Sequence, residues 1–164
     1  MAVSLDDVDV RLLSELEQDA SRTNVELARL AGFSPAATLN RVRRLKESGA
    51  IRRIGARLDS AAVGFPLQVY VTLTLARQDQ AAHDRFVKVV EETPQVIAAD
   101  WVTGEVDAVL MIVARDVAEL QVVLSRLNLR GGAQRLITLL RLEELKPASP
   151  LPLRPTSVQR ARGR

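Results

Sequence analysis

Residues 23–46 read TNVELARLAGFSPAATLNRVRRLK, and this stretch decides the fold of the N-terminal part of the chain. Thr23, with a glutamate three positions later, has the pattern of a capping box, which satisfies backbone N–H groups at a helix start. Gly32 suits the end of that helix, because glycine adopts the left-handed conformation without strain. Ser34 followed by Pro35 then opens a second helix. We therefore predict two short helices joined by a tight turn.

The second of these helices has an apolar side and a polar side. On a helical wheel the apolar side groups Leu39, Val42 and Leu45. The opposite side carries residues at spacing i, i+3, i+4 and i+7, namely Ala37, Asn40, Arg41 and Arg44. Asparagine pairs bidentately with adenine and arginine with guanine. Two helices across a glycine-containing turn form a helix-turn-helix, whose second helix enters the DNA major groove. Alternatively, the stretch is a solvated helix of an unrelated small bundle.

Positive charge is concentrated on the same part of the chain. The whole sequence has a formal net charge of +3, and residues 147–164 carry four arginines and no acid. Residues 33–57 hold seven basic side chains and one acidic side chain, whereas residues 1–32 hold three basic and seven acidic ones. A surface that binds phosphates needs this kind of local excess. The charge distribution therefore favours DNA binding by residues 33–57.

The expected DNA contacts fall into two groups. Direct base readout is expected from Asn40, Arg41 and Arg44, and contacts that position the helix on phosphates from Ser34, Thr38, Arg43, Arg52 and Arg53. The complete predicted DNA-binding set is Ser34, Pro35, Ala37, Thr38, Asn40, Arg41, Arg43, Arg44, Arg52 and Arg53.

The segments on either side of residues 23–46 support them. A first helix is expected to start at Ser4 and to end near residues 16–18, with its acidic side chains in solvent. Residues 51–59 read as a short strand, a turn and a strand, which would form a wing beside the helix-turn-helix. Alternatively, they are only a strand that leads out of the domain. Residues 60–66 then have the composition of a linker.

From Leu67 onward the hydrophobic period changes. Residues 67–75 alternate as a strand does, and further strands are expected at 96–103, 108–114 and 133–142, with helices at 79–93 and from Asp116. The order βαββαβ is the ferredoxin-like arrangement, in which two helices cover one face of an antiparallel sheet. The other face would be apolar on alternate residues, and an uncovered apolar face usually indicates an oligomer.

The predicted fold class is therefore α+β. A (winged) helix-turn-helix domain at 1–60 is followed by a linker at 61–66, a ferredoxin-like oligomerisation domain at 67–146, and a mobile Pro/Arg-rich tail at 147–164. The chain has no cysteine, so disulfides, thiol nucleophiles and Cys-ligated metals are excluded. No secretory pattern or membrane-length apolar run appears, and we expect a soluble cytoplasmic protein without membrane partners.

Three stretches resemble the leucine-responsive regulatory protein/AsnC family of regulators. They are LDDVDVRLL from Leu5, the helix-turn-helix with RVRRLKESGAI from Arg41, and VTGEVD from Val102. The resemblance covers roughly residues 5–142. It implies sequence-specific binding to double-stranded DNA, homodimers that pair through open sheet faces and often assemble to tetramers or octamers, and an amino-acid effector bound at subunit contacts.

The resemblance also marks an effector-binding loop, Thr103, Gly104, Glu105, Val106 and Asp107. The glycine permits close backbone approach, the two carboxylates suit an α-ammonium group, and turn N–H groups suit an α-carboxylate. Alternatively, the loop is simply a hairpin turn with polar ends. Val106 and Ala108 are smaller than the aromatic residues that many members carry, so leucine is not assumed to be the effector.

Two other functions remain as alternatives. One is an architectural protein that binds DNA without an effector and with little sequence preference. The other is an enzyme like the sirohaem decarboxylases, which share the two-domain architecture and use histidines in the corresponding domain. This chain has a single histidine, His83, expected on the exposed side of a helix, and no triad, metal cluster or phosphate loop. We therefore expect no catalytic residues, no metal and no cofactor.

Overall fold

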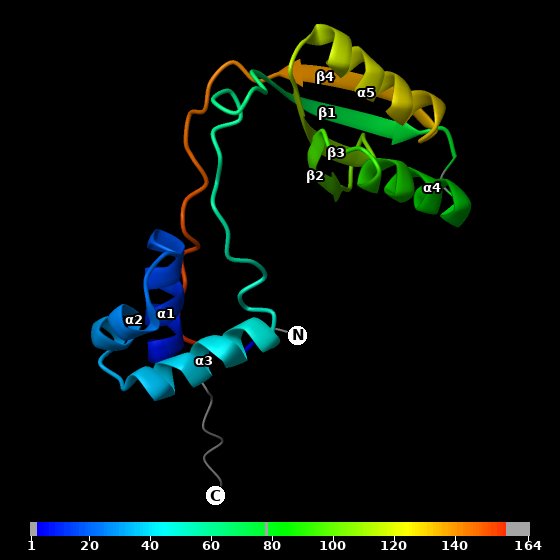
Figure 1. Ribbon diagram of the computed structural model, residues 1–164. Coiled ribbons are helices and arrows are strands. Elements are labelled where there is room, and N and C mark those ends of the chain that lie inside the picture. The colour runs from blue at the N-terminus through cyan, green and yellow to red at the C-terminus, as the bar shows by residue number, and fades with distance from the viewer. Residues whose placement is uncertain (1–2, 78, 157–164) are drawn as a thin grey trace, which may run out of the picture. The chain divides into compact units, whose positions relative to one another are not determined.

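Local capping groups set where the N-terminal helices begin. The computed structural model describes residues 3–77 and 79–156. In it, the first part of the chain forms the three helices α1 (Asp7–Gln18), α2 (Asn24–Ala31) and α3 (Pro35–Glu47) (Figure 1). The first helix starts later than predicted, because Asp6, not Ser4, is its N-cap and exchanges capping-box hydrogen bonds with Asp9. Aspartate caps as well as serine does, and here it has a reciprocal partner.

The turn between α2 and α3 is built as the sequence predicts. Thr23 and Glu26 form a reciprocal capping box at the start of α2, and Gly32 ends it with φ 77°. Ser34 Oγ accepts a hydrogen bond of 3.2 Å from the N–H of Ala37 at the start of α3. The two helices contact each other, with Leu27 of α2 in a small core beside Leu12 of α1. The predicted helix-turn-helix is confirmed.

The segment after α3 differs from the predicted wing. Residues 51–58 are extended but contain no strand and no hairpin. A two-stranded hairpin is marginal by itself in water, and this segment has no Asn-Gly or similar pair to set a tight turn. The alternative that the segment only leads out of the domain agrees better with the structure.

The C-terminal segment also differs from the prediction of a mobile tail, as far as Thr156. The chain divides into two units, and the part from Lys146 to Thr156 groups with the helical unit. The N–H of Thr156 donates to the Leu5 carbonyl over 2.9 Å, and the N–H of Leu151 donates to the Glu17 carboxylate over 3.2 Å. Leu151 and Leu153, on alternate positions, line a pocket of about 590 Å³ beside α1. The segment is therefore hydrogen-bonded to the helical unit as far as Thr156. The predicted part at 157–164 lies outside the described residues.

The second unit contains a four-stranded antiparallel sheet. Its elements are β1 (Leu67–Leu75), α4 (Gln80–Glu91), β2 (Val96–Trp101), β3 (Ala108–Ala114), α5 (Val117–Leu129) and β4 (Ala133–Leu140). The strand order is β2-β3-β1-β4, and every neighbouring pair is antiparallel. The predicted ferredoxin-like βαββαβ fold is confirmed.

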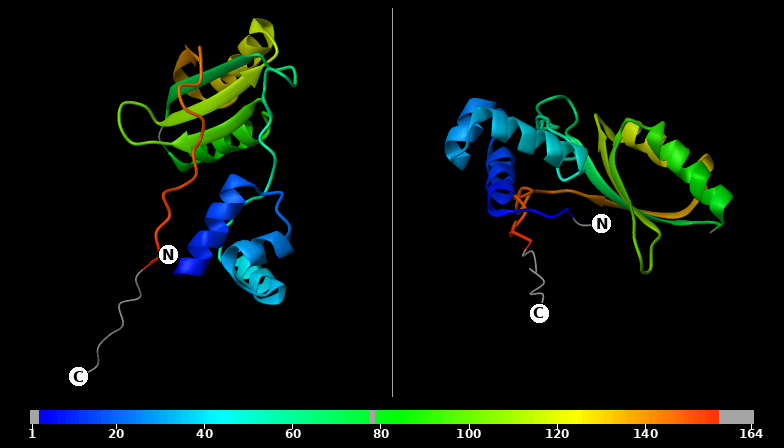
Figure 2. Two further views of the ribbon diagram at one scale, coloured as in Figure 1. Left: turned by 90° about the vertical axis from the view of Figure 1, so that its left-hand side faces the viewer. Right: turned by 90° about the horizontal axis from the view of Figure 1, so that it is seen from below.

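Both helices cover the same face of this sheet, as two further views show (Figure 2). Alternate residues of β1, namely Val69, Val71 and Leu73, are buried there against Phe86 of α4 and Leu127 of α5. The register sets Val71 opposite both Leu110 and Thr138. The other face is left uncovered. In the described ranges, no helix is long and apolar enough to cross a membrane.

Candidate nucleic-acid interface and effector loop

The start of α3 is held against α2 by polar contacts. The Asn24 side-chain amide donates to the Pro35 carbonyl over 2.7 Å, so the first residues of the two helices are tied together. Ser34 and Pro35 are exposed at this end. The free N–H groups of a helix start suit a phosphate oxygen. Two of the predicted DNA-contacting residues therefore lie at the exposed N-terminus of α3, as the sequence predicts.

The solvent-exposed face of α3 is rotated by about one residue relative to the predicted face. Asn40 and Arg43 are exposed, and Leu39, predicted inside, is 49% exposed. Thr38, predicted to contact phosphate, is completely buried, and Ala37 is half-buried. Both α1 and α2 contact α3, and Thr38 lies on its buried side. The predicted apolar side of this helix did not include Thr38. The outer face of α3 is therefore formed by Ala36, Leu39, Asn40 and Arg43.

Arg41 and Arg44, predicted to read bases, have partners on α1. Arg41 Nη1 donates to Asp6 over 2.7 Å and to Asp9 over 3.0 Å, and its guanidinium lies 5.5 Å from the centre of the Phe33 ring. Arg44 also donates to Asp9. Asp9 is 1% exposed, contrary to the prediction that the acids of the first helix face solvent.

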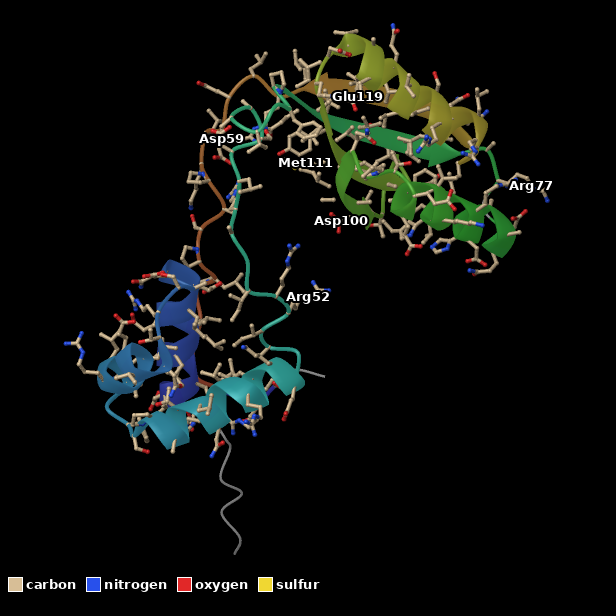
Figure 3. The ribbon with its side chains drawn as sticks, in the orientation of Figure 1. Arg52, Asp59, Arg77, Asp100, Met111 and Glu119 are labelled. Atoms are coloured by element: carbon tan, nitrogen blue, oxygen red, sulfur yellow. The ribbon has the colours of Figure 1, made fainter. Side chains whose placement is uncertain are left out.

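Hydrogen bonds at this contact shift two pKa values. The Asp6 carboxylate raises the pKa of Arg41 further above its ordinary value. Partial burial by itself would raise the pKa of Asp6, but the backbone N–H of Asp9 and the Arg41 guanidinium together hold that pKa below its ordinary value. Both groups are therefore charged across the physiological range. Arg52 and Arg53 lie on the extended segment after α3 and are exposed, and the Arg52 side chain extends away from the ribbon (Figure 3).

The predicted effector loop connects β2 to β3. Thr103, Gly104 and Glu105 are exposed, whereas Val106 and Asp107 are half-buried. Gly104 has φ 130°, a conformation that favours glycine. All five predicted effector-binding residues thus lie in one loop, and only the last two of them are partly buried.

Asp107 connects this loop to the end of β1. Its carboxylate accepts a hydrogen bond of 2.7 Å from the N–H of Leu75, and its own N–H donates to the Leu73 carbonyl over 2.9 Å. The Asp107 carbonyl accepts from the N–H of Val102 over 3.0 Å and closes the loop. Asp107 therefore has a structural role, in addition to any contact with a ligand.

A pocket of about 310 Å³ lies beside the loop. It is formed by the loop ends, the end of β1 and the start of α4, and is lined by Leu75, Asp79, Gln80, His83, Trp101, Val102 and Asp107. The His83 ring stacks on Trp101, with the ring centres 4.6 Å apart. Sequence reasoning missed Asp79, His83 and Trp101 as site residues. The predicted βαββαβ topology could have indicated these residues, because it brings the start of α4 next to the loop after β2.

The uncovered sheet face is apolar along its centre. Tyr70 of β1, Met111 of β3 and Leu139 of β4 lie at neighbouring register positions, and Tyr70 and Leu139 are 39% and 52% exposed. Ile137 extends this patch along β4. Figure 3 labels Met111 on β3 and Asp100 on the edge strand β2. The predicted apolar open face is therefore present.

Comparison with known families accounts for both units. Two family models match the chain, the AsnC-type helix-turn-helix domain over residues 5–46 and the Lrp/AsnC ligand binding domain over residues 68–151. The HTH-type transcriptional regulator AldR of Mycolicibacterium smegmatis is 36% identical, with 92% of this chain and 88% of the relative covered. The leucine-responsive regulatory protein of Rhizobium meliloti is 35% identical, with 89% and 94% covered.

Solved structures give the same result for the fold. A transcriptional regulator from Neisseria meningitidis, solved as a complex with L-Met, superposes with a TM-score of 0.83 at 29% identity, covering 91% of this chain and 97% of that chain. An AsnC family transcriptional regulator from Agrobacterium tumefaciens superposes with a TM-score of 0.82 at 28% identity, covering 90% and 97%.

Proposed function

The chain belongs to the Lrp/AsnC family of transcriptional regulators, and we propose that it binds a dyad-symmetric site in double-stranded DNA as a homodimer. The observation that carries this proposal is the capped α2–α3 pair, with Asn40 and Arg43 exposed on the outer face of α3. The two α3 helices of a dimer would enter the major groove about one helical turn, or about 34–36 Å, apart.

Dimerisation through the uncovered sheet face completes this proposal. The apolar patch at Tyr70, Met111 and Leu139 supports it, because such a patch is buried when two copies pair. Dimers of this kind would carry two helix-turn-helix units, as a dyad-symmetric site requires. Further assembly to tetramers or octamers is the expectation that follows from the family.

We further propose that an amino acid or a similar small metabolite binds at the loop 103–107, at contacts between subunits. The neighbouring pocket of about 310 Å³ supports this, since small-molecule sites begin at about 300 Å³. Asp79 and Asp107 are among the residues that line it, and a carboxylate suits an α-ammonium group. The L-Met complex of the Neisseria meningitidis regulator provides a precedent for that protein. An effector changes DNA binding only if it has different affinities for two states of the assembly.

A gel-shift experiment tests both parts of the proposal. The DNA is the region upstream of the protein's own gene and its divergent neighbour, with scrambled DNA at the same salt concentration as the control, and the twenty amino acids are added singly. Preferential binding to the upstream region that one amino acid strengthens or abolishes is the expected result. Preferential binding that is insensitive to every amino acid would overturn the proposal that the effector is an amino acid. Equal binding to upstream and scrambled DNA would favour the architectural alternative.

Mixing the protein with sirohaem tests the alternative that it is an enzyme. The relatives are named as transcriptional regulators, and His83 stacks on Trp101 in the pocket beside the loop. We expect no Soret band that follows the protein through gel filtration. A stoichiometric band would contradict the assignment of this unit to effector binding alone.

A further inference from the structure

A buried carboxylate lies where α1 meets α3. Asp9 is 1% exposed, yet it belongs to the first turn of α1 and neighbours the exposed Asp7. Its two oxygens accept from Arg41 and Arg44 of α3, and one of them also accepts from the N–H of Asp6 over 3.2 Å. A buried carboxylate is costly unless it is paired and hydrogen-bonded, so Asp9 fixes where these two arginines lie.

The same contact removes Arg41 from the outer face of α3. Its Nη1 is shared between Asp6 and Asp9, and the flat side of its guanidinium lies over Phe33. The Arg41 side chain is 27% exposed, against 56% for Arg44. Arg41 is therefore held between α1 and α3, and it is not presented for a bidentate contact with guanine.

The charges of this cluster cancel. Two carboxylates, Asp6 and Asp9, face two guanidinium groups, Arg41 and Arg44. Lys46, in the last turn of α3, is exposed outside this cluster, and so is Arg43, which lies on the outer face. Asn40 and Leu39 lie beside it at spacings i−3 and i−4. A leucine at this place suits the methyl group of thymine, as asparagine suits adenine and arginine suits guanine.

We propose that Asp9 is a positioning residue for DNA recognition, which sets α3 against α1, holds Arg41 between the two helices and neutralises the charge of the exposed Arg44. Sequence readout then rests on Leu39, Asn40 and Arg43. This inference depends on the proposed DNA-binding function and assigns its specificity. Asp9 itself does not touch DNA.

The variant Asp9→Asn separates this role from a purely structural one. Loss of the negative charge leaves Arg44 without an ion pair and Arg41 with Asp6 alone, so binding to scrambled DNA becomes stronger, and its dependence on salt becomes steeper. Each additional phosphate contact changes the slope of log K against log[salt] by about 0.9. The preference for upstream DNA falls by about tenfold or more, because α3 is no longer held in one position. A purely structural aspartate would lower both affinities and leave the slope unchanged.

Asp7→Asn is the matched control, because it removes the same charge from the same helical turn at an exposed position. We expect its preference and salt slope to stay within error of the wild-type values. Circular dichroism checks that each variant is folded. Asp9→Asn with wild-type preference and wild-type slope would overturn the inference.

A second pair of variants decides the question even if Asp9→Asn does not fold. Arg41→Gln and Arg43→Gln make the same change two positions apart on α3. We expect Arg43→Gln to lose about ten- to hundredfold of the preference for upstream over scrambled DNA, and Arg41→Gln to weaken both complexes by similar factors. The reverse result would overturn the inference. Failure of the proposed function has a different signature, because the wild-type protein would then show no preference.

Discussion

At the scale of single residues, Glu119 shows how one carboxyl group joins three parts of the second unit. Its carboxylate accepts hydrogen bonds from the Arg115 side chain over 3.0–3.1 Å, from the Arg115 backbone N–H over 2.7 Å, and from the Gln95 side chain over 2.9 Å. These bonds connect the first turn of α5 to the segment before it and to the segment that leads into β2. The Arg115 guanidinium and backbone N–H, with Gln95, lower the pKa of Glu119 from 4.5 to about 2.

This shift predicts a pH-dependent contribution to stability. Because the pKa of Glu119 is lower in the folded state, the contribution is complete above about pH 4.5 and is lost as the pH falls toward 2. In urea unfolding, Glu119→Gln should therefore be less stable than the wild type at pH 6, with the difference shrinking between pH 4.5 and 2. Glu91→Gln, at an exposed position on α4, is the control. A difference that stays constant over this pH range would contradict the prediction.

Single residues also show where sequence reasoning stopped. The capping residues Thr23, Ser34 and Gly32 were predictable, because each acts on the backbone within a few positions of itself. The buried side of α3 differs from the predicted side by about one residue, because contacts with other helices bury Thr38. The role of Arg41 was not predictable from spacing on α3, because its partners Asp6 and Asp9 lie more than thirty positions away on α1.

At the scale of elements, the start of α2 determines the geometry of the helix-turn-helix. The Glu26 carboxylate accepts from both the N–H and the hydroxyl of Thr23, each over 2.8 Å. The backbone N–H of Thr23, followed by its hydroxyl, holds the pKa of Glu26 below the ordinary range. The bond from Asn24 to Pro35 then connects this end of α2 to α3.

Removal of the cap should destabilise the helical unit. Thr23→Ala loses the hydroxyl that accepts from the Glu26 N–H, and we expect the free energy of unfolding to fall by about 1 kcal/mol. Thr23→Ser restores a capping hydroxyl and should recover most of this loss. Urea unfolding followed by circular dichroism measures both variants. If the alanine and serine variants are equally stable, the cap does not contribute as the structure implies.

Element boundaries followed the sequence wherever a strong local signal was present. The strand at 67–75 and the strand at 108–114 were predicted with their observed bounds, because the first alternates apolar and polar residues and the second is a short continuous apolar run. The predicted wing at 51–59 is absent, since the segment has no Asn-Gly or similar pair to set the tight turn of a hairpin. The loop 103–107 was found, whereas the pocket beside it also needed residues of α4, which only the folded topology brings near.

At the scale of the whole molecule, the uncovered sheet face predicts self-association. Ile137 lies on β4 opposite Thr72 and is 39% exposed, so Ile137→Asp changes the surface of a single copy and leaves the core intact. A charge buried in an apolar interface is costly without a partner. We expect this variant to sediment as a monomer and the wild type as a dimer or larger assembly.

Val122→Asp is the matched control for that experiment. Val122 is 62% exposed on α5, which covers the opposite face of the sheet. Its sedimentation coefficient should equal that of the wild type. If Ile137→Asp remains associated while Val122→Asp dissociates, the helical face forms the interface.

The order of the two domains was predictable from the sequence, because the change in hydrophobic period at Leu67 marks the start of the sheet. The docking of the C-terminal segment was not predictable. Leu151 donates to Glu17 across 134 positions, and a short Leu-Pro-Leu segment has no periodic pattern that identifies its partner.

The central claim is that two copies of α3 read the major groove of one DNA site. Hydroxyl-radical footprinting combined with methylation interference on the upstream DNA tests it most directly, with the full chain bound. The account predicts guanine N7 interference in two major-groove patches on one face of the DNA, about one helical turn apart. Protection without such patches, or uniform protection of upstream and scrambled DNA alike, would contradict it.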